Sequence, residues 1–379
     1  MKIAHIVDSM EVGGAETLVA QMCRLQREQG HQPSVYAVAA LGALGEQLLR
    51  DGFMVEANVG RHLLDATRSF YRIFRATHPD VVHLHNPTPT IYAAMAARLA
   101  GVPSIVSTRH SLVGPPRAWV QEVKYALAAR FCDWVVGICD ATVGNLRSLH
   151  TIPRRKLVRI YNGAAALRRV PPEHCPPKSG FTLLYVGRLV PVKNHALLLE
   201  AFRIALASVP TLRLWMVGDG SERAATERLA ADLGIADEVT FWGQQLDVAP
   251  FFSAADAFVL SSRSEGLPMS LLQAFSLGLP AIVTDVGGMA EVVRLAEGGI
   301  VVPVNDPGVT ANAILRLESS DPERARLRMR ASNAFQTHFK MQTMTDAYMK
   351  LYLHPERTSR QGAQGVTDLN VRPNKRVDP

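Results

Sequence analysis

Residues 259–278 read Val-Leu-Ser-Ser-Arg-Ser-Glu-Gly-Leu-Pro-Met-Ser-Leu-Leu-Gln-Ala-Phe-Ser-Leu-Gly. The apolar run that ends at Leu260 is long enough for a buried parallel strand. Pro268 is favoured at the first position of a helix, and apolar residues then recur at helical spacing until Gly278, which is expected to end that helix. The stretch therefore predicts a strand, a loop and a helix, which is the repeating unit of a parallel α/β sheet.

Glu265 lies in the predicted loop, shortly before the helix. A helix N-terminus presents unpaired N–H groups and the positive end of its dipole, and both favour an anion. One interpretation is a ligand that carries a phosphate for the amides and sugar hydroxyls for the carboxylate. The other is that Glu265 only complements the helix dipole, and this stretch alone does not choose between them.

The composition is that of a globular protein. The chain has 379 residues, 47% hydrophobic and 20% charged, and this length favours two domains. Every apolar run is interrupted before it reaches membrane-spanning length, and the first residues become polar too early for a signal peptide. The four cysteines form no CxxC pair, so we expect free thiols in a reducing cytosol. The net charge of +7 favours anionic partners such as nucleotides, phospholipid surfaces or nucleic acid.

Strand-like and helix-like patterns alternate along nearly the whole chain. Strands are predicted at 2–8, 34–40, 53–57, 80–85, 104–108, 134–138, 156–161, 182–186, 213–217, 239–242, 257–260, 281–284 and 299–302. Helices are predicted between them, the clearest at 15–29, 45–51, 62–77, 88–100, 117–130, 140–150 and 195–207, and again over 321–350. Such alternation predicts parallel sheets with helices on both faces, whose ligands bind at the carboxyl ends of the strands.

A proline-rich passage over 170–180 predicts a linker between two such sheets. We therefore expect an α/β protein with an N-terminal domain over 1–170 and a C-terminal domain over 171–339, two doubly wound, Rossmann-like domains facing a cleft. The residues beyond Pro355 are polar and aperiodic, and 356–379 is predicted to be a disordered tail.

Candidate ligand contacts in the first half lie where its strands end. Gly13 and Gly14 would let the backbone approach a ligand, or form only a tight turn, and they are not part of a GxGxxG fingerprint. His83 and His85 point to the same face of one strand. They suit structural or acceptor-lining roles, and the alternative, a metal site, has no third ligand at a familiar spacing. His110 follows another strand, where a loop histidine more often meets a ligand than the core.

Two cations follow the first strand of the second half. Arg188 and Lys193 lie on one predicted loop, where a guanidinium fork and an ammonium would clamp a diphosphate. The alternative is a solvated charged loop. The turn Gly218-Asp-Gly220 ends the next strand, and all these groups should meet Glu265 at one rim of the sheet. Cations, backbone amides and a carboxylate together favour a ligand with phosphates and a sugar.

The motifs in this order resemble those of glycosyltransferase family 4, a class of retaining, nucleotide-sugar-dependent enzymes with the GT-B fold. They are Gly-Gly-Ala-Glu (13–16), Ser-Thr-Arg-His (107–110), Tyr-Asn-Gly (161–163), Gly-Arg-Leu-Val-Pro-Val-Lys-Asn-His (187–195), Gly-Asp-Gly (218–220), Ser-Glu-Gly-Leu-Pro (264–268) and Thr-Asp-Val-Gly-Gly (284–288). The resemblance reaches about residue 353. It implies that a last helix over 340–353 packs back on the first domain.

The resemblance also implies a role for each candidate residue. Arg188 and Lys193 would hold the donor diphosphate, Glu265 would bind hydroxyls of the transferred sugar, and His110 would contact that sugar near the transferred carbon. Further donor contacts are implied for Gly14, Gly187, Gly218, Asp219, Gly243, Gln244, Gly266, Leu267, Met269, Ser270 and Gln273. The stretch 241–245 would border the nucleobase. No metal and no cofactor is implied, because the two cations take the place of a metal at the diphosphate.

Two positions depart from the family pattern. Gln273 stands where the family usually has a second glutamate that binds the ribose hydroxyls. An amide still forms hydrogen bonds but lacks the charge, so we expect weaker nucleotide binding or an altered base preference. The sequence Asn-Gly-Ala-Ala (162–165) replaces the usual Asn-Gly-Val-Asp, which leaves that hinge contact in doubt.

The predicted function is transfer of a hexosyl unit from a nucleotide diphosphate sugar to an acceptor hydroxyl, with retained anomeric configuration, in polysaccharide or glycolipid biosynthesis. The partners would be the donor and a glycan or lipid-linked acceptor, and no nucleic acid. Two alternatives stay open. One is a nucleotide-sugar 2-epimerase, for which we find no acid/base pair, and the other is a non-catalytic nucleotide-sugar-binding pseudoenzyme, suggested by Gln273.

One predicted helix suggests membrane contact. It combines four arginines with aromatic and aliphatic residues, namely Arg61, Arg68, Phe70, Tyr71, Arg72, Ile73, Phe74 and Arg75, and a second basic run lies over 147–159. A basic amphipathic surface suits anionic headgroups. The alternative is a helix with one face in the core and solvated arginines on the other. We expect a cytoplasmic protein, with peripheral contact at the inner face of the plasma membrane as a further hypothesis.

Overall fold

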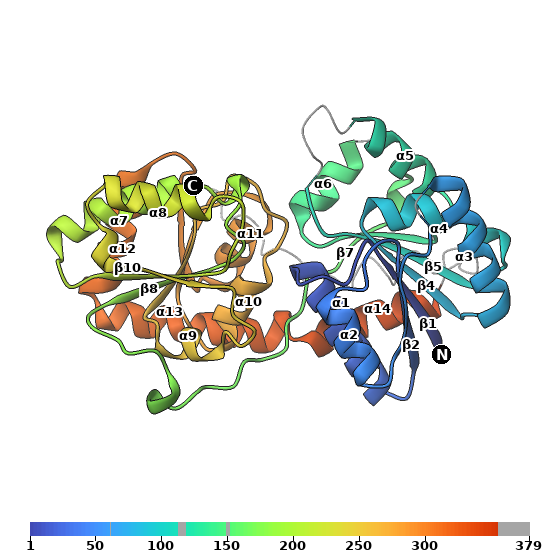
Figure 1. Cartoon of the computed structure of the whole chain (residues 1–379), viewed down its shortest axis with the longest axis horizontal. Coiled ribbons are helices and arrows are strands. Elements are labelled where there is room, and N and C mark those ends of the chain that lie inside the picture. Colours follow the sequence, from blue (N-terminus) through green and yellow to red (C-terminus); the bar gives the residue numbers. More distant parts are fainter. Residues whose placement is uncertain (61, 113–118, 149–151, 355–379) are drawn as a thin grey trace, which may run out of the picture. The chain divides into compact units, whose positions relative to one another are not determined.

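The computed structural model describes residues 1–60, 62–112, 119–148 and 152–354. Its contacts divide the chain into two compact units, of which unit 1 comprises Met1–Asn162 and Met341–Pro379 and unit 2 comprises Gly163–Lys340 (Figure 1). Arg61, the ends of two predicted helices at 117–118 and 149–150, and the predicted tail 356–379 lie outside the described residues. Each unit is built on one parallel sheet, as the alternation of patterns predicts.

Unit 1 contains a seven-stranded sheet with the order β3-β2-β1-β4-β5-β6-β7 among the described residues. Its strands are β1 (Lys2–Val7), β2 (Gln32–Ala37), β3 (Met54–Glu56), β4 (Val81–His85), β5 (Ser104–Arg109), β6 (Trp134–Gly137) and β7 (Leu157–Arg159). Its helices are α1 (Gly14–Glu28), α2 (Gly42–Arg50), α3 (Leu63–Thr77), α4 (Pro87–Leu99), α5 (Trp119–Ala129), α6 (Asp140–Ser148) and α14 (Met341–Leu353). The order reverses between β1 and β4, which is the doubly wound arrangement.

Two hydrophobic clusters lie on the two faces of this sheet. On one face, Phe70 and Phe74 of α3 pack with buried residues of α4, α5 and the strands. On the other face, Val19 and Cys23 of α1 pack against Val7 and Val35. Strand side chains alternate between the faces, so β1 and β2 contribute residues to both clusters.

Helix α14 lies against the same face as α1 (Figure 1). Its Tyr348 and Tyr352 are buried and reach strand residues, because the Tyr348 hydroxyl lies 3.0 Å from Thr108 Oγ1 and the Tyr352 hydroxyl 2.7 Å from His83 Nδ1. Just beyond the helix, the carbonyl of His354 accepts a hydrogen bond from Trp134 Nε1 at 3.0 Å. The last described residues of the chain therefore complete the core of unit 1.

Unit 2 contains a six-stranded parallel sheet, within the part of the chain that is described, with the order β10-β9-β8-β11-β12-β13. Its strands are β8 (Thr182–Val186), β9 (Arg213–Val217), β10 (Val239–Gly243), β11 (Ala257–Leu260), β12 (Ala281–Thr284) and β13 (Gly299–Val302). Its α-helices are α7 (His195–Ser208), α8 (Arg223–Asp232), α9 (Ala249–Ala254), α10 (Met269–Ser276), α11 (Gly287–Ala296), α12 (Pro307–Ser319) and α13 (Asp321–Ala334). Helices α8 and α12 pack beside α7, whereas α10 and α11 pack beside α13 on the other face (Figure 1).

The helix predicted over 321–350 is interrupted in the structure. Helix α13 ends at Ala334, a π-helical turn covers Phe335–Phe339, and Lys340 has an extended backbone before α14 begins. A contact with another segment accompanies this interruption: the carbonyl of Phe339 accepts a hydrogen bond from the N–H of Ala164 at 2.9 Å. A carbonyl that bonds to another segment is not available to the next helical turn. Helical propensity alone did not indicate this contact.

The proline-rich passage 170–180 also differs from its prediction as a linker. It belongs to unit 2, and its first residue is anchored there because the N–H of Val170 donates to Ser253 Oγ at 3.0 Å. The division between the units falls instead between Asn162 and Gly163, whereas the predicted boundary stands at 170/171. Proline and glycine mark irregular backbone, which is also found within a unit.

A buried ion pair fixes the loop that follows β5. Arg109 donates two hydrogen bonds to Glu122 of α5, at 3.0 and 2.6 Å, and both side chains are at most 5% exposed. The guanidinium also donates to the carbonyl of Ser111 at 3.1 Å. This bidentate arrangement satisfies the buried charges and ties the segment on both sides of His110 to α5.

We predict that replacing one residue of this pair destabilises unit 1 more than replacing both. Arg109→Met or Glu122→Leu leaves one uncompensated buried charge and should lower the free energy of unfolding by about 3–5 kcal/mol, whereas the double variant should lose much less. Lys124→Met, at an exposed position of the same helix, should change stability by no more than about 0.5 kcal/mol. Urea unfolding followed by circular dichroism measures all four proteins. Single variants as stable as the wild type would contradict the expectation.

Candidate functional site

The loops at the carboxyl ends of β8, β9 and β10 are joined by backbone contacts. The N–H of Gly187 donates to Val217 at 3.0 Å, and the N–H of Gly218 donates to Gly243 at 2.8 Å. Gly218 has a φ of 134°, and a Cβ atom there would lie 2.0 Å from the carbonyl oxygen of Gly187. Glycine at position 218 therefore allows the two loops to touch. The structure brings the predicted glycines 187, 218 and 243 together at one rim of the sheet.

Lys193 and Glu265 meet at this rim. Lys193 ends a short 3-10 helix after β8, Glu265 lies in the loop between β11 and α10, and its Oε1 accepts from the Lys193 ammonium. Ser262 Oγ donates to the same oxygen at 3.1 Å. Ser261 Oγ lies 2.9 Å from the carbonyl of Lys193 and so joins the two loops. The two charged side chains are only 14% and 15% exposed, so their charges are partly shielded from water.

Arg188 borders the same spot. The carbonyl of Arg188 accepts a hydrogen bond from the hydroxyl of Tyr185 at 3.0 Å, and His195 Nε2 lies 3.0 Å from that hydroxyl. Burial raises the pKa of Tyr185, the carboxylate of Glu265 raises it further, and the Arg188 guanidinium opposes that rise. Both charges therefore act on one hydroxyl. Arg188 itself is exposed, as a group that meets a ligand can be.

Helix N-termini add positive potential to the rim. Helices α7, α10 and α11 follow β8, β11 and β12 directly, so their first turns start at the carboxyl edge of the sheet. Helix α10 begins at Met269, one residue later than predicted, and Pro268 is its N-cap residue, which has no donor or acceptor in its side chain. Met269 and Ser270 form its first turn and are half-buried, as is Gln273 one turn later. Gly266 and Leu267 are buried, and the carbonyl of Gly266 accepts from the N–H of Gly288 at 2.7 Å.

Asp219 and Gln244 occupy the outer part of the rim. Asp219 is exposed and accepts from the N–H of Gly220 at 2.7 Å, a bond that lowers its pKa. Arg223, which the sequence did not single out, donates to Asp219 at 3.2 Å and lies 3.1 Å from the point where a Cβ on Gly243 would be. Gln244 is exposed beside Gly243. The carboxylate of Asp219 is thus engaged by its own neighbours.

Trp242 belongs to an aromatic cluster. Its ring packs edge-on against Trp215 and Phe251, with centroids 6.0 and 5.2 Å apart. Its Nε1 is shielded from solvent and has no hydrogen-bond partner among the residues described. Of the stretch 241–245, the tryptophan is therefore held in packing while Gln244 and Gln245 are exposed.

A cluster of histidines lies in unit 1. His5 on β1 and His83 on β4 are paired in register, and His85 follows on the same face of β4. His5 Nε2 lies 2.8 Å from Gln26 Oε1, and His5 Nδ1 lies 3.1 Å from His85 Nε2. These side chains are at most 2% exposed. Burial is the main cause that lowers the pKa of His5 to about 4 and holds those of His83 and His85 well below the usual value.

His110 continues this cluster toward the end of β5. His110 Nε2 lies 3.0 Å from His85 Nδ1, and burial lowers the pKa of His110 to about 4. Its backbone N–H donates to Asn86 Oδ1 at 3.2 Å. Asn86 has a φ of 75°, a conformation that non-glycine residues adopt rarely and that is found at functional sites. Gly14, the other predicted contact in unit 1, is the exposed first residue of α1.

The three buried histidines also satisfy a geometric condition for metal binding. One ring nitrogen from each of His5, His83 and His85 lies within 4.8 Å of the others. Yet every ring nitrogen of the three already lies within hydrogen-bonding distance of a partner, since His83 is held by Tyr352 and Thr108 at 2.7 Å each. A metal would have to replace these bonds. The absence of a metal remains a prediction from the sequence.

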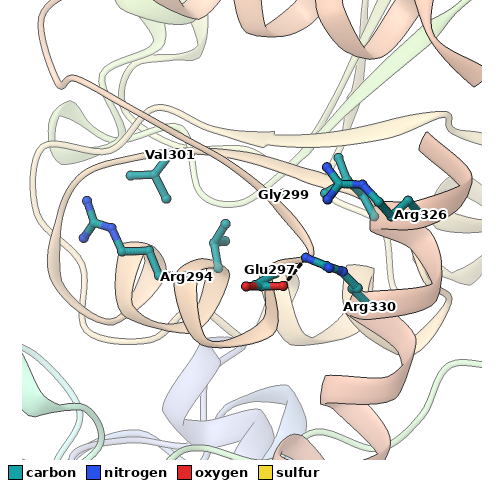
Figure 2. A pocket seen from close by; sticks show the side chains of 8 residues that line it. Arg294, Glu297, Gly299, Val301, Arg326 and Arg330 are labelled. Carbon is teal, nitrogen blue, oxygen red and sulfur yellow. Dashed lines mark hydrogen bonds and ion pairs between the residues drawn. The ribbon is translucent and has the colours of Figure 1, made fainter. Parts of the chain in front are cut away.

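A separate pocket of about 320 Å³ lies elsewhere in unit 2. Figure 2 shows Arg294 extending from α11, Arg326 and Arg330 from α13, and Glu297 bonded to Arg330. None of the predicted donor contacts lines it. Arg294 bonds to Asp285 at 2.6 Å and Arg326 lies 3.4 Å from Glu323, so each of the three arginines faces a carboxylate. We do not regard this pocket as the functional site.

Sequence reasoning missed four residues that the structure places beside predicted ones. They are His5, Gln26, Asn86 and Arg223. His5 is a single polar residue within an apolar strand pattern, whereas Gln26 lies among polar residues near the end of a helix, so nothing in the spacing distinguishes either of them. Asn86 carried a signal, because an Asn-Pro pair directly after a strand marks a turn with unusual backbone angles.

Two family models match consecutive parts of the chain. They are Glycosyltransferase Family 4 over residues 12–165 and Glycosyl transferases group 1 over residues 169–334. The lipopolysaccharide core biosynthesis glycosyltransferase LpsE of Rhizobium meliloti is 34% identical over 46% of this chain and 50% of its own length. The chain thus spans about half the length of that relative. The UDP-Gal:alpha-D-GlcNAc-diphosphoundecaprenol alpha-1,3-galactosyltransferase of Escherichia coli is 26% identical over 66% of this chain and 69% of its own length.

Solved structures are similar over nearly the whole fold. HepE of Anabaena in complex with UDP has a TM-score of 0.80 at 19% identity and covers 92% of this chain and 99% of its own. WaaG, a glycosyltransferase involved in lipopolysaccharide biosynthesis, has a TM-score of 0.71 at 17% identity over 92% of this chain and 99% of its own. These likenesses show the GT-B fold. The two family models, which follow one another along the chain, show that the protein belongs to the group 1 glycosyltransferases of family 4.

Proposed function

We propose that the protein transfers a hexosyl unit from a nucleotide diphosphate sugar to an acceptor hydroxyl, with retention at the anomeric carbon. The observation that carries this proposal is the meeting of Lys193 and Glu265 beside Arg188 at the carboxyl rim of the unit 2 sheet. A diphosphate would take the cations and the helix N-termini, and the sugar hydroxyls would donate to the carboxylate. A ligand that carries both parts satisfies every charge at the rim.

The chemistry that these groups support is stabilisation of the leaving group. When the bond between the sugar and the diphosphate breaks, negative charge grows on the diphosphate. Arg188, Lys193 and the first turn of α10 are fixed donors for that charge. The acceptor oxygen forms the new bond to the anomeric carbon, and its proton leaves with the diphosphate. No metal or cofactor enters this proposal.

Similar proteins favour a uridine nucleotide as the donor to test first. HepE has been solved with UDP-glucose, and the E. coli relative is named for UDP-Gal and a diphosphoundecaprenol acceptor. LpsE is named for lipopolysaccharide core biosynthesis. We therefore propose a UDP-hexose donor and a glycan or lipid-linked acceptor in polysaccharide or glycolipid assembly.

Two other activities would use the same binding groups. A nucleotide-sugar 2-epimerase would convert donor alone into an epimer, and a pseudoenzyme would bind donor without turning it over. The relatives named above are transferases, which favours neither alternative. Donor incubated with and without acceptor separates the three, because only a transferase releases UDP in step with glycosylated acceptor.

Lys193→Ala should lower turnover by roughly 10²–10³-fold, the range for losing one preorganised donor at a developing charge. The matched control is Lys178→Ala, since Lys178 also pairs with an acid of unit 2, Asp256, but lies away from the rim residues. Release of UDP from donor and acceptor measures both variants. Near-normal turnover of Lys193→Ala would remove Lys193 from the site.

Gln273→Glu should tighten nucleotide binding by roughly fivefold to tenfold, because a carboxylate accepts a ribose hydroxyl with a charge-assisted bond that the amide lacks. Isothermal titration with UDP measures the change. Gln342→Glu, at an exposed position of α14, adds the same charge in unit 1 and should leave UDP affinity unchanged. Equal affinity in the wild type and Gln273→Glu would show that Gln273 does not contact the ribose.

We also propose that unit 1 meets an anionic membrane through α3, α4 and α5. These helices pack side by side, and Leu64, Leu99 and Leu127 are 70%, 66% and 53% exposed. Phe70 and Phe74 of α3 are in the core, so the apolar part of this surface is the leucines and Tyr71. The exposed arginines of α3 would meet the headgroups. None of the helices in the described part of the chain has the length and apolar character needed to cross a bilayer.

Replacing the three described arginines of α3, Arg68, Arg72 and Arg75, by glutamate should abolish sedimentation with vesicles that contain anionic lipid at low salt. Each basic residue near such a surface contributes about 1 kcal/mol to binding. In the control variant, glutamate replaces the three arginines of the unit 2 pocket, Arg294, Arg326 and Arg330, so that the net charge changes by the same amount. Loss of sedimentation in both variants would indicate net charge alone, and no sedimentation of the wild type would refute docking.

A further inference from the structure

Three buried side-chain nitrogens of unit 1 have no hydrogen-bond partner among the described residues, namely Gln26 Nε2, Arg98 Nη1 and His110 Nδ1, and the last lies at the end of the histidine cluster. The other ring nitrogen of His110, Nε2, lies 3.0 Å from His85 Nδ1. A buried polar atom without a partner is costly, and in a native structure it calls for a ligand or another specific explanation.

Hydrogen-bond direction along the cluster can be worked out from one end. The Gln26 amide is placed with Oε1 2.8 Å from His5 Nε2, while its own Nε2 has no hydrogen-bond partner among the described residues. In this orientation Oε1 accepts and His5 Nε2 carries a proton. A neutral imidazole has one N–H, so His5 Nδ1 accepts from His85 Nε2 at 3.1 Å. His85 Nδ1 then accepts from His110 Nε2 at 3.0 Å. The Nδ1 of His110 is left as a bare lone pair.

Burial keeps the imidazoles of His5, His85 and His110 neutral. His5 and His85 are 0% and 2% exposed, and a cationic imidazole would lose its hydration there. Burial lowers the pKa of His5 and of His110 to about 4, and burial is also the main cause that holds the pKa of His85 well below its usual value. At neutral pH each ring therefore carries one proton, and the three contacts have a single consistent pattern.

His83 is a useful comparison, because it lies in the same cluster but is not part of the hydrogen-bond series Gln26–His5–His85–His110. Its Nδ1 bonds to the hydroxyl of Tyr352 and its Nε2 to Thr108 Oγ1, both at 2.7 Å. Hydroxyls donate or accept as required, so they do not impose one tautomer. A direction starts only from the acceptor-only oxygen of Gln26.

We propose that Gln26, His5 and His85 are positioning residues that lock His110 in the Nε2–H tautomer, so that its Nδ1 accepts a hydrogen bond from a hydroxyl of a sugar substrate. The identity of the ligand rests on the proposed function, whereas the tautomer does not. Asn86 fixes the backbone of His110 and so the direction of the lone pair. A site built around a buried acceptor binds a hydroxyl and discriminates against a sugar that lacks it.

Imidazole nitrogen shifts test the tautomer without any substrate. Protein labelled with ¹⁵N-histidine is examined by long-range ¹H–¹⁵N correlation, and the His110 signals are assigned from their loss in His110→Asn. We expect an unprotonated Nδ1 and a protonated Nε2 between pH 6 and 8. A protonated Nδ1 would overturn the proposal, as would one stoichiometric zinc ion bound through His5 and His85 in the purified protein.

Three variants test the positioning chain. Gln26→Leu removes the terminal acceptor, so His110 should populate both tautomers, whereas Gln26→Glu keeps an acceptor-only oxygen and the wild-type pattern. Tyr348→Phe removes a hydroxyl that contacts Thr108, the Nε2 partner of His83, and should leave the His110 signals unchanged. Unchanged His110 signals in Gln26→Leu, folded by thermal unfolding, would refute the role of Gln26. If no variant folds, the wild-type spectrum alone decides.

Turnover gives the second readout. Gln26→Leu should lower kcat roughly tenfold, about the effect of one misplaced hydrogen bond, with the KM for acceptor unchanged, and Gln26→Glu should restore it. A normal kcat in a Gln26→Leu protein whose tautomer has changed would refute the link to the sugar. If the wild type turns over no nucleotide sugar, the proposed function fails while the spectrum still decides the tautomer.

Discussion

Parallel pairing of strands is the constraint on which the rest of this structure depends. Every loop that leads from a strand to the following helix starts at the same edge of its sheet. In unit 2 this edge collects Arg188, Lys193 and Glu265 from loops that are far apart in sequence. These loops bury some side chains, such as Leu189 and Leu267, and carry the charged ones at the rim between them. The sheet supplies position and the loops supply chemistry, which is why motifs of a few residues each identify this family.

In the contact between Lys193 and Glu265, each side chain is the counter-charge of the other at this rim. Each side chain is mostly shielded from water, so each needs a counter-charge while no ligand is bound. In the proposed function, a diphosphate sugar would replace the partner of both, with oxygens for the ammonium and hydroxyls for the carboxylate. A phosphate without a sugar would leave the carboxylate facing negative charge. The pair therefore favours a ligand with both parts, and the serines at 261 and 262 hold the two loops that carry it.

The sequence was most accurate where local pattern and burial agree. Strands such as Thr182–Val186 and Ala257–Leu260 have the predicted bounds, because short apolar runs between polar or glycine-rich loops leave little choice. The contact of Lys193 with Glu265 could be predicted from topology, since both follow neighbouring strands. The break at Lys340 could not, because it depends on a bond to Ala164 that is remote in sequence. His83 and His85 were recognised as sharing a face, but the partners that decide their role come from other elements.

Those partners explain why the chain keeps a polar cluster inside a hydrophobic unit. Residues 5, 83 and 85 face α1 and α14, whereas Val82 and Leu84, which alternate with the histidines of β4, belong to the cluster that α3, α4 and α5 cover. Four imidazoles without partners would be too costly to bury. Gln26 from α1 and Tyr352 from α14 supply the missing partners, one to each branch of the cluster. The last described helix of the chain is thus needed to satisfy a strand of the first sheet, and among the four imidazoles the ring nitrogen without a described partner belongs to the histidine that follows the end of β5.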